Sequence, residues 1–182
     1  MRLSYIPDDQ KIGLLIPIFK NKGSVKDSKN YQGIIITPTM SKLVEAVIKI
    51  RINPIVIKYQ NPLQRGFTKK TAPLNCSFII EEYHRENNDV HDQTILSMLD
   101  AKSAFDAVKH AGLIRRLYQL NIPNQLILLI DNLYKNAVSS VKWNNQTSDT
   151  FKKEQGVRQG ETLSADLYKI YINTLLNILI II

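Results

Sequence analysis

A carboxylate follows a short, mostly apolar run near the middle of the chain. The run from Ile95 to Leu99 leads to Asp100, and Phe105 and Asp106 come soon after it. Such a run, bounded by polar residues, is typical of a strand buried on both faces. Its terminal Asp would lie at the rim of a sheet, where open α/β folds place their chemistry. We expect Asp100 to be a metal ligand and Phe105 to form an aromatic wall beside the substrate. The alternative is a structural Asp100 that only ends a strand or caps the next helix.

A second stretch further along the chain favours the chemical interpretation. It reads Gln155-Gly156-Val157-Arg158-Gln159-Gly160-Glu161-Thr162-Leu163-Ser164. Together the two stretches resemble motifs A and B of reverse transcriptases, in particular those of non-LTR (LINE-like) retrotransposons. Motif A of that family reads apolar-Asp-x-x-x-Ala-Phe-Asp, and motif B reads Gly-Val-Arg-Gln-Gly-x-x-Leu-Ser. We name residues 95–106 motif A and residues 156–164 motif B.

The resemblance covers nearly the whole chain and implies an α/β (α+β) fold. This fold would be the fingers and partial palm of a right-hand polymerase, with a mixed or antiparallel palm sheet packed on helices. About residues 1–90 would form the fingers, and about residues 91–182 the partial palm that carries both motifs. The implied function is that of an RNA-directed DNA polymerase fragment. Its implied partners are an RNA template, a DNA primer, deoxynucleoside triphosphates and the remaining parts of the element's polyprotein, inside the cell in cytoplasm and nucleus.

The same resemblance gives roles to the motif A residues. Asp100 would be the catalytic residue and a ligand of Mg²⁺ or Mn²⁺, with two ions in the complete enzyme, and the Ala101 carbonyl would add an oxygen. The amides around Ser103 and Ala104 would face the triphosphate. The Phe105 ring would block a ribose 2′-hydroxyl and so favour deoxynucleotides.

Motif B and the basic residues complete the implied site. Gln159 and Gly160 would form a turn against the nucleotide and the template. Four cations would contact nucleic acid: Lys20, Lys22, Arg65 and Arg158. The N-terminal third supports this role, because residues 1–60 carry ten Lys or Arg and four Asp or Glu. Clustered cations of this kind neutralise phosphates.

The chain departs from the family pattern in several places. Gln32-Gly33 stands where the family has Arg-Pro, and a Gln supplies neither the charge nor the planar fork with which that Arg grips the triphosphate. Glu161-Thr162 replaces Asp-Pro in motif B. No aromatic-x-Asp-Asp (motif C) follows Gly160, so we expect that the chain alone does not polymerise and that Leu175 to Ile182 are exposed.

Two other functions are considered beside the polymerase. The first is a non-catalytic nucleic-acid-binding relic of such an element, which keeps the fold and the basic surface. The second is a phosphotransferase with a strand-end Asp nucleophile, but that chemistry wants a second Asp two residues later, where Lys102 stands.

Composition is that of an ordinary folded domain. The 182 residues are 44% hydrophobic and 22% charged, with a net charge of +8, which excludes a disordered chain. The single Cys76 excludes an internal disulfide and a cysteine zinc site. The opening residues do not predict a signal peptide, and the apolar stretch from Tyr168 to Ile182 is too short and too polar to span a membrane.

Local patterns predict the elements that would position these residues. Gly13 to Phe19 is expected to be an edge strand because it contains Pro17, and Ile34 to Thr37 a second strand. A helix from Ser41 should end at Asn53-Pro54. A second helix, from Pro73 to Asn87, would turn Phe78, Ile79 and Tyr83 to the core. Further helices are expected at 108–120, 125–135 and 163–179, and a hairpin at 138–151.

Overall fold

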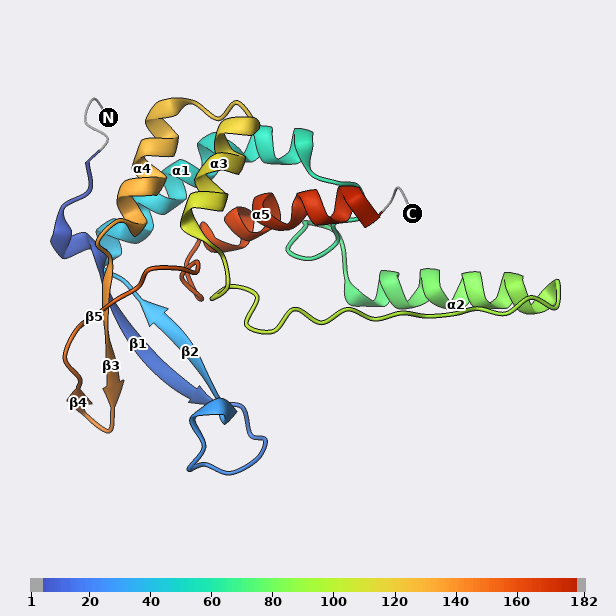
Figure 1. Ribbon diagram of the computed structural model, residues 1–182, viewed down its shortest axis with the longest axis horizontal. Helices are drawn as coiled ribbons and strands as arrows, with labels where there is room; N and C mark the ends of the chain where they lie inside the picture. The colour runs from blue at the N-terminus through green and yellow to red at the C-terminus, as the bar shows by residue number, and fades with distance from the viewer. Residues whose placement is uncertain (1–4, 180–182) are drawn as a thin grey trace.

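The computed structural model describes residues 5–179 and shows a helical layer above a twisted sheet (Figure 1). Met1 to Ser4 and the last three residues of the apolar run to Ile182 lie outside this range. The sheet has five strands: β1 (Ile12–Phe19), β2 (Tyr31–Ile36), β3 (Val138–Trp143), β4 (Gln146–Thr147) and β5 (Phe151–Lys152). Two 3₁₀ turns, η1 (Asp8–Lys11) and η2 (Ser28–Asn30), precede β1 and β2.

Strand β1 lies inside the sheet, so the prediction of an edge strand was wrong. The strand order is β2-β1-β3-β4, with β5 also paired to β3. β1 runs antiparallel to β2 from Leu14 to Phe19, but it runs parallel to β3 only from Ile12 to Leu15. Pro17 therefore lies where β1 has a single neighbour, and its missing N–H costs no hydrogen bond to β3.

Four helices make the core above the sheet. They are α1 (Thr39–Tyr59), α3 (His110–Gln119), α4 (Asn124–Tyr134) and α5 (Ser164–Leu179). Each contributes fully buried apolar side chains to one cluster: Ile48, Ile52, Leu113, Leu117, Ile127, Ile130, Leu133, Leu167 and Ile170. The predicted helices at 108–120, 125–135 and 163–179 are confirmed, as is the predicted α/β class with a mixed sheet packed on helices.

Helix α1 continues through Pro54, where the sequence predicts its end. The part of the helix after Pro54 buries Val56 in the core and packs the partly buried Ile55 against it. Pro in a helix interior removes one hydrogen bond and costs about 3 kcal/mol, whereas fully burying a side chain such as Val56 returns about 1.5–3 kcal/mol and the partial burial of Ile55 adds to it. Burial thus outweighs the local signal.

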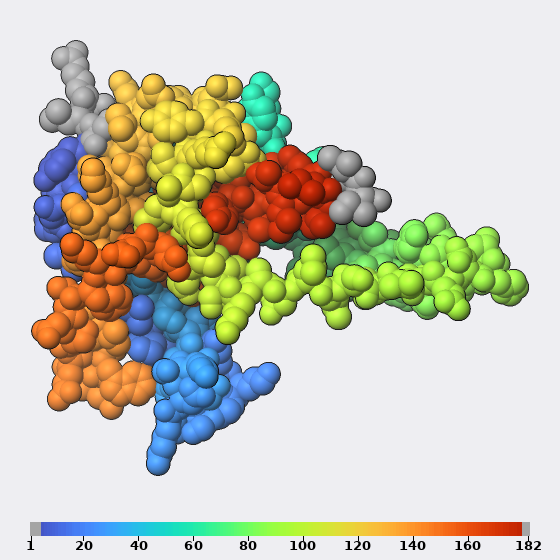
Figure 2. Space-filling model, in the orientation of Figure 1, coloured from blue at the N-terminus to red at the C-terminus, as the bar shows by residue number. Residues whose placement is uncertain are grey.

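Helix α2 (Pro73–Asp89) and the segment that follows it project from the body as an arm (Figures 1 and 2). We define the arm as residues 73–100. The helix itself was predicted correctly, but the prediction that Phe78, Ile79 and Tyr83 face the core was wrong. Their side chains are 61%, 55% and 59% exposed. Residues 93–100 run back along α2 as an extended segment outside any strand, so the strand predicted before Asp100 is not formed among the described residues.

Candidate nucleotide-binding site

The motif B turn is built on two glycines with positive φ. Gly156 has φ +90° and Gly160 has φ +100°, a backbone region that only glycine enters at little cost. A Cβ on Gly156 would lie 2.9 Å from the Asp106 Cα atom. A Cβ at Gly156 would therefore require the backbone to move, and a side chain at Gly160 would be strained by the positive φ of that residue.

The N-terminal half of this turn is hydrogen-bonded to the end of motif A. The Gly156 N–H donates to the Val108 carbonyl at 2.7 Å, and the Val157 N–H donates to the Phe105 carbonyl at 2.8 Å. His110 Nε2 lies 2.9 Å from the Gly156 carbonyl. These contacts bring the two predicted motifs together across about fifty residues of sequence.

The C-terminal half of the turn is attached to strand β2. The Ile35 N–H donates to the Gln159 carbonyl at 3.0 Å. A Cβ on Gly160 would lie 3.1 Å from Ile34 Cγ2, so the glycine permits a close approach of turn and strand. Motif B is thus held between the sheet and motif A.

Phe105 packs among aromatic side chains. Its ring stacks on Tyr168 of α5, with ring centroids 4.9 Å apart, and meets Phe67 edge-on at 5.6 Å. Ser103 has φ +52°, and its carbonyl accepts the N–H groups of Asp106 and Ala107. The tight turn that results carries Ser103, Ala104 and Phe105 from the arm into the body.

Arg158 points into the interior. It is 3% exposed, and its Nη2 donates to the carbonyls of Lys11 and Leu133 at 3.2 and 3.1 Å. Its Nη1 lies 3.9 Å from Glu45, and its guanidinium lies over the Tyr134 ring. In this position Arg158 has no surface on which to meet a phosphate, contrary to the role that the sequence assigns to it.

Glu45 and Glu161 complete a buried polar cluster with Arg158. Glu45 Oε2 accepts the Leu163 N–H at 3.2 Å, and Glu161 Oε1 accepts the Thr37 hydroxyl at 2.6 Å. Burial and then the nearby Glu161 raise the pKa of Glu45 to about 7, against the pull of the Leu163 N–H, Arg158 and Lys42. Glu45 thus ties Leu163, just before α5, to α1, and Glu161 is tied to Thr37, just after β2, so the cluster fixes the far end of motif B.

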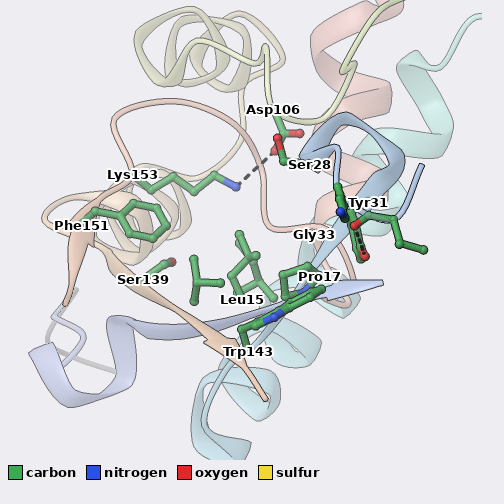
Figure 3. A pocket seen from close by; sticks show the side chains of 14 residues that line it. Leu15, Pro17, Ser28, Tyr31, Gly33, Asp106, Ser139, Trp143, Phe151 and Lys153 are labelled. Carbon is green, nitrogen blue, oxygen red and sulfur yellow. Dashed lines mark hydrogen bonds and ion pairs between the residues drawn. The ribbon is translucent and has the colours of Figure 1, made fainter. Parts of the chain in front are cut away.

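A pocket of about 630 Å³ lies between one face of the sheet and Asp106, the last residue of motif A (Figure 3). Strand residues such as Leu15, Gly33 and Ser139 form its floor, and Asp106 and Lys153 lie at its rim. Lys153 Nζ is 3.5 Å from Asp106 Oδ1. Burial lowers the pKa of the Lys153 ammonium, and the Asp106 carboxylate opposes that shift.

The remaining predicted site residues lie apart from this centre. Asp100 and Ala101 are exposed at the base of the arm. Lys20 and Lys22 are exposed on the β1–β2 loop, and Arg65 is exposed between α1 and α2. These positions leave all of them open to solvent, and hence to a large ligand.

A match to a family model extends over residues 20–181. The model describes reverse transcriptase (RNA-dependent DNA polymerase). The chain belongs to the reverse transcriptase family. The resemblance found in motifs A and B is therefore confirmed over most of the chain.

Curated relatives of this reverse transcriptase chain come from retrotransposons. It is 23% identical, over 86% of its length, to the Retrovirus-related Pol polyprotein of the type-2 retrotransposable element R2DM of Drosophila melanogaster. It is 26% identical over 94% of its length to the probable RNA-directed DNA polymerase of the Drosophila melanogaster transposon X-element. It is 27% identical over 94% of its length to the RNA-directed DNA polymerase of the mobile element jockey of Drosophila funebris. The chain spans 15% to 19% of the length of these relatives.

Reverse transcriptases use divalent metal ions, and the carboxylates that the structure describes do not gather into a site for them. Within residues 5–179 no three His, Cys, Asp or Glu side chains lie close enough together to hold a metal ion. Asp100 is thus a single candidate ligand rather than part of a formed centre. The described residues also contain no helix long and apolar enough to cross a bilayer.

Sequence reasoning missed three residues that pack around the motifs, the buried Glu45 and the partly buried Tyr168 and Lys153. Glu45 and Tyr168 carry no motif, and Lys153 lies outside motif B. Glu45 did have a signal, since it occupies the same helical face as Ser41, Ile48 and Ile52. A lone carboxylate on a core-facing stripe requires a buried partner.

Proposed function

We propose that this chain supplies the fingers and the first part of the palm of a non-LTR retrotransposon reverse transcriptase. About residues 1–90 would be fingers, and about residues 91–182 palm. One observation carries the proposal: the motif B turn is bonded to motif A through Val157 and to strand β2 through Gln159. Fingers and palm are thereby joined at the point where both motifs would meet a nucleotide.

The site residues keep the roles that the resemblance implies, as proposals. Asp100 would be the catalytic carboxylate and metal ligand, with the Ala101 carbonyl beside it. Ser103, Ala104 and Phe105 would contact the incoming deoxynucleotide. Gln159 and Gly160 would lie against the base pair that it forms with the RNA template.

The metal site needs more than these residues supply. A two-metal polymerase centre holds Mg²⁺ or Mn²⁺ between carboxylates and phosphate oxygens, and within the described residues Asp100 belongs to no group of three His, Cys, Asp or Glu side chains that could hold a metal ion. We propose that residues 95–100 become a strand when a further part of the palm pairs with them. Four exposed apolar side chains there support this idea: Ile95, Leu96, Met98 and Leu99.

The exposed cations would hold the primer–template duplex by its phosphates. Lys20 and Lys22 extend from the β1–β2 loop, and Arg65 lies between α1 and α2. Arg158 would act differently, as a positioning residue, because its guanidinium is buried against main-chain carbonyls. The loop cations therefore carry the salt-dependent part of the binding.

Duplex binding at several salt concentrations tests this proposal. For a labelled RNA template annealed to a DNA primer, log affinity should fall with log salt by about 0.7–0.9 per phosphate neutralised. Lys20→Gln/Lys22→Gln should reduce that slope by about 2. The matched control is Arg115→Gln/Lys135→Gln, which removes two exposed cations from α3 and the end of α4. A slope that is flat, or that changes equally in both double variants, contradicts the proposal.

A non-catalytic nucleic-acid-binding relic is the second candidate. Gln32 favours it, because this exposed β2 residue lacks the charge that the family places there to grip a triphosphate. Gln32→Arg separates the two candidates when triphosphate binding is measured directly. Tighter triphosphate binding by the variant, with unchanged duplex binding, would show that the chain keeps a nucleotide site and has lost one contact.

A further inference from the structure

Helix α1 exposes an apolar stripe with the spacing of a coiled-coil seam. Its members recur at intervals of three and four residues on the face opposite the core, over nearly the whole helix. The stripe consists of Met40, Leu43, Val47, Ile50, Pro54 and Ile57. Ile50 is 73% exposed and Ile57 63% exposed. We name these residues the α1 stripe.

The stripe makes α1 apolar on two opposite sides. Ile48, Ile52 and Val56 bury the inner side among the other helices. A surface helix usually has one apolar stripe, and a helix that is apolar all round is normally covered on every side. Intervals of three and four match the a and d positions of a heptad, at which one helix inserts side chains into another. The outer side of α1 therefore has the form of a helix-binding surface.

The charges beside the stripe select the partner. Lys42, Arg51 and Lys58 flank it and are exposed, whereas Lys49 is engaged by Asp166. The single acidic residue of α1, Glu45, is buried on the inner side. A second copy of α1 would place like charges opposite one another, which disfavours pairing. A helix with acidic flanks would be complementary.

We propose that the outer face of α1 docks an amphipathic helix whose apolar heptad seam is flanked by Asp and Glu, supplied from outside these 182 residues. The chain spans 15% to 19% of the length of its relatives, so partner segments within the same polyprotein are a ready source. The α1 stripe contains none of the motif A, motif B or β1–β2 loop residues, so helix docking there is independent of the proposed polymerase function.

The test uses a synthetic helix as the probe. A labelled peptide of about four heptads, with Leu in the seam and Glu on the flanks, should bind the chain in a fluorescence anisotropy titration. Ile50→Asp should weaken binding by at least about tenfold, since the seam loses a buried apolar side chain and gains a negative charge. The control is Leu74→Asp on α2, at a position 77% exposed, which should leave binding unchanged.

Charge exchange tests the flanks and guards against misfolded variants. The double variant Arg51→Glu/Lys58→Glu should no longer bind the Glu-flanked peptide and should instead bind a version of the peptide with Lys on its flanks. Absence of binding by the Glu-flanked peptide, or equal binding by Ile50→Asp, overturns the proposal. Two further results would also overturn it by identifying another occupant: a dimer of the chain that Ile50→Asp dissociates in sedimentation, or capture on anionic lipid vesicles that Ile50→Asp abolishes.

Discussion

Replacing Arg158 with Met should greatly destabilise the chain. The guanidinium is 3% exposed, donates to two main-chain carbonyls and faces the Glu45 carboxylate at 3.9 Å. Met has a similar reach but neither charge nor donor. The carbonyls of Lys11 and Leu133 would lose a charged donor, and Glu45 would lose its cation.

The expected magnitude follows from the burial of this cluster. Removing one partner of a buried ion pair costs about 3–5 kcal/mol, much of it from the charge that stays behind. A hydrogen bond from a charged donor contributes about 1.5–3 kcal/mol, but that loss overlaps with the first and does not simply add. We expect Arg158→Met to lower the free energy of unfolding by about 3–5 kcal/mol, a large share of the about 5–15 kcal/mol typical of a domain.

Urea denaturation followed by circular dichroism measures this loss. It is best done above pH 7, where the Glu45 carboxyl is ionised. The control is Arg115→Met, which removes an exposed cation from α3 and should change stability by about 0.5 kcal/mol or less. Arg158→Met/Glu45→Gln should recover part of the loss, because no unpaired charge remains. A loss below about 1 kcal/mol for Arg158→Met would contradict the burial of Arg158 in a polar cluster and would indicate that its side chain is exposed to solvent.

Four further predictions concern pH, the turn and the chemistry. Folded Glu45, with a pKa of about 7 against an ordinary 4.5, holds its proton more tightly than the unfolded chain does. The free energy of unfolding should therefore fall by up to about 3 kcal/mol as pH rises through this range, and Glu45→Gln should remove that fall in denaturation curves. Gly156→Ala should lower the melting temperature strongly because of the positive φ and the contact with the motif A backbone, whereas Gly112→Ala, with a Tyr171 ring atom 3.3 Å away, should not. Primer extension on an RNA template with Mg²⁺ or Mn²⁺ should be absent for the 182-residue chain, and extension that Asp100→Ala abolishes would show a complete enzyme. In a chimera that completes the palm, Phe105→Ala should raise ribonucleotide incorporation, and an unchanged ratio of ribo- to deoxynucleotide would remove Phe105 as the sugar gate.

Local signals predicted the helices well where periodicity and burial agree. In α3, Leu113 and Leu117 face the core at the spacing that the sequence shows, and Pro123 separates α3 from α4 as expected. The family could also be recognised from the sequence, because motif B matches the family pattern over a long, ordered stretch. Its glycines indicate a turn, although the partners of that turn, Ile35 and Phe105, are visible only in three dimensions.

Errors arose where distant contacts decide the outcome. Pro17 indicates an edge strand, but β3 pairs with β1 only as far as Leu15 and leaves the Pro beyond that pairing. Arg158 was given a nucleic-acid-binding role, yet its guanidinium is buried and Glu45 provides its partner from 113 residues away in the sequence. The strand before Asp100 has an apolar pattern but no neighbouring strand among the described residues, and an isolated strand is not stable in water.

The arm also divides the chain into two pieces, and these two pieces are held together by contacts outside the arm. Residues before the arm are tied to residues after it by the β1–β3 pairing and by the hydrogen bonds Ile6–Asn132 and Asn61–Asn173. Within the arm, a side-chain bond joins Asn87 to Thr94. A protease that cuts the exposed arm should therefore yield two fragments that stay associated and migrate as one species until denatured. Expressed separately, the same two pieces should assemble by complementation.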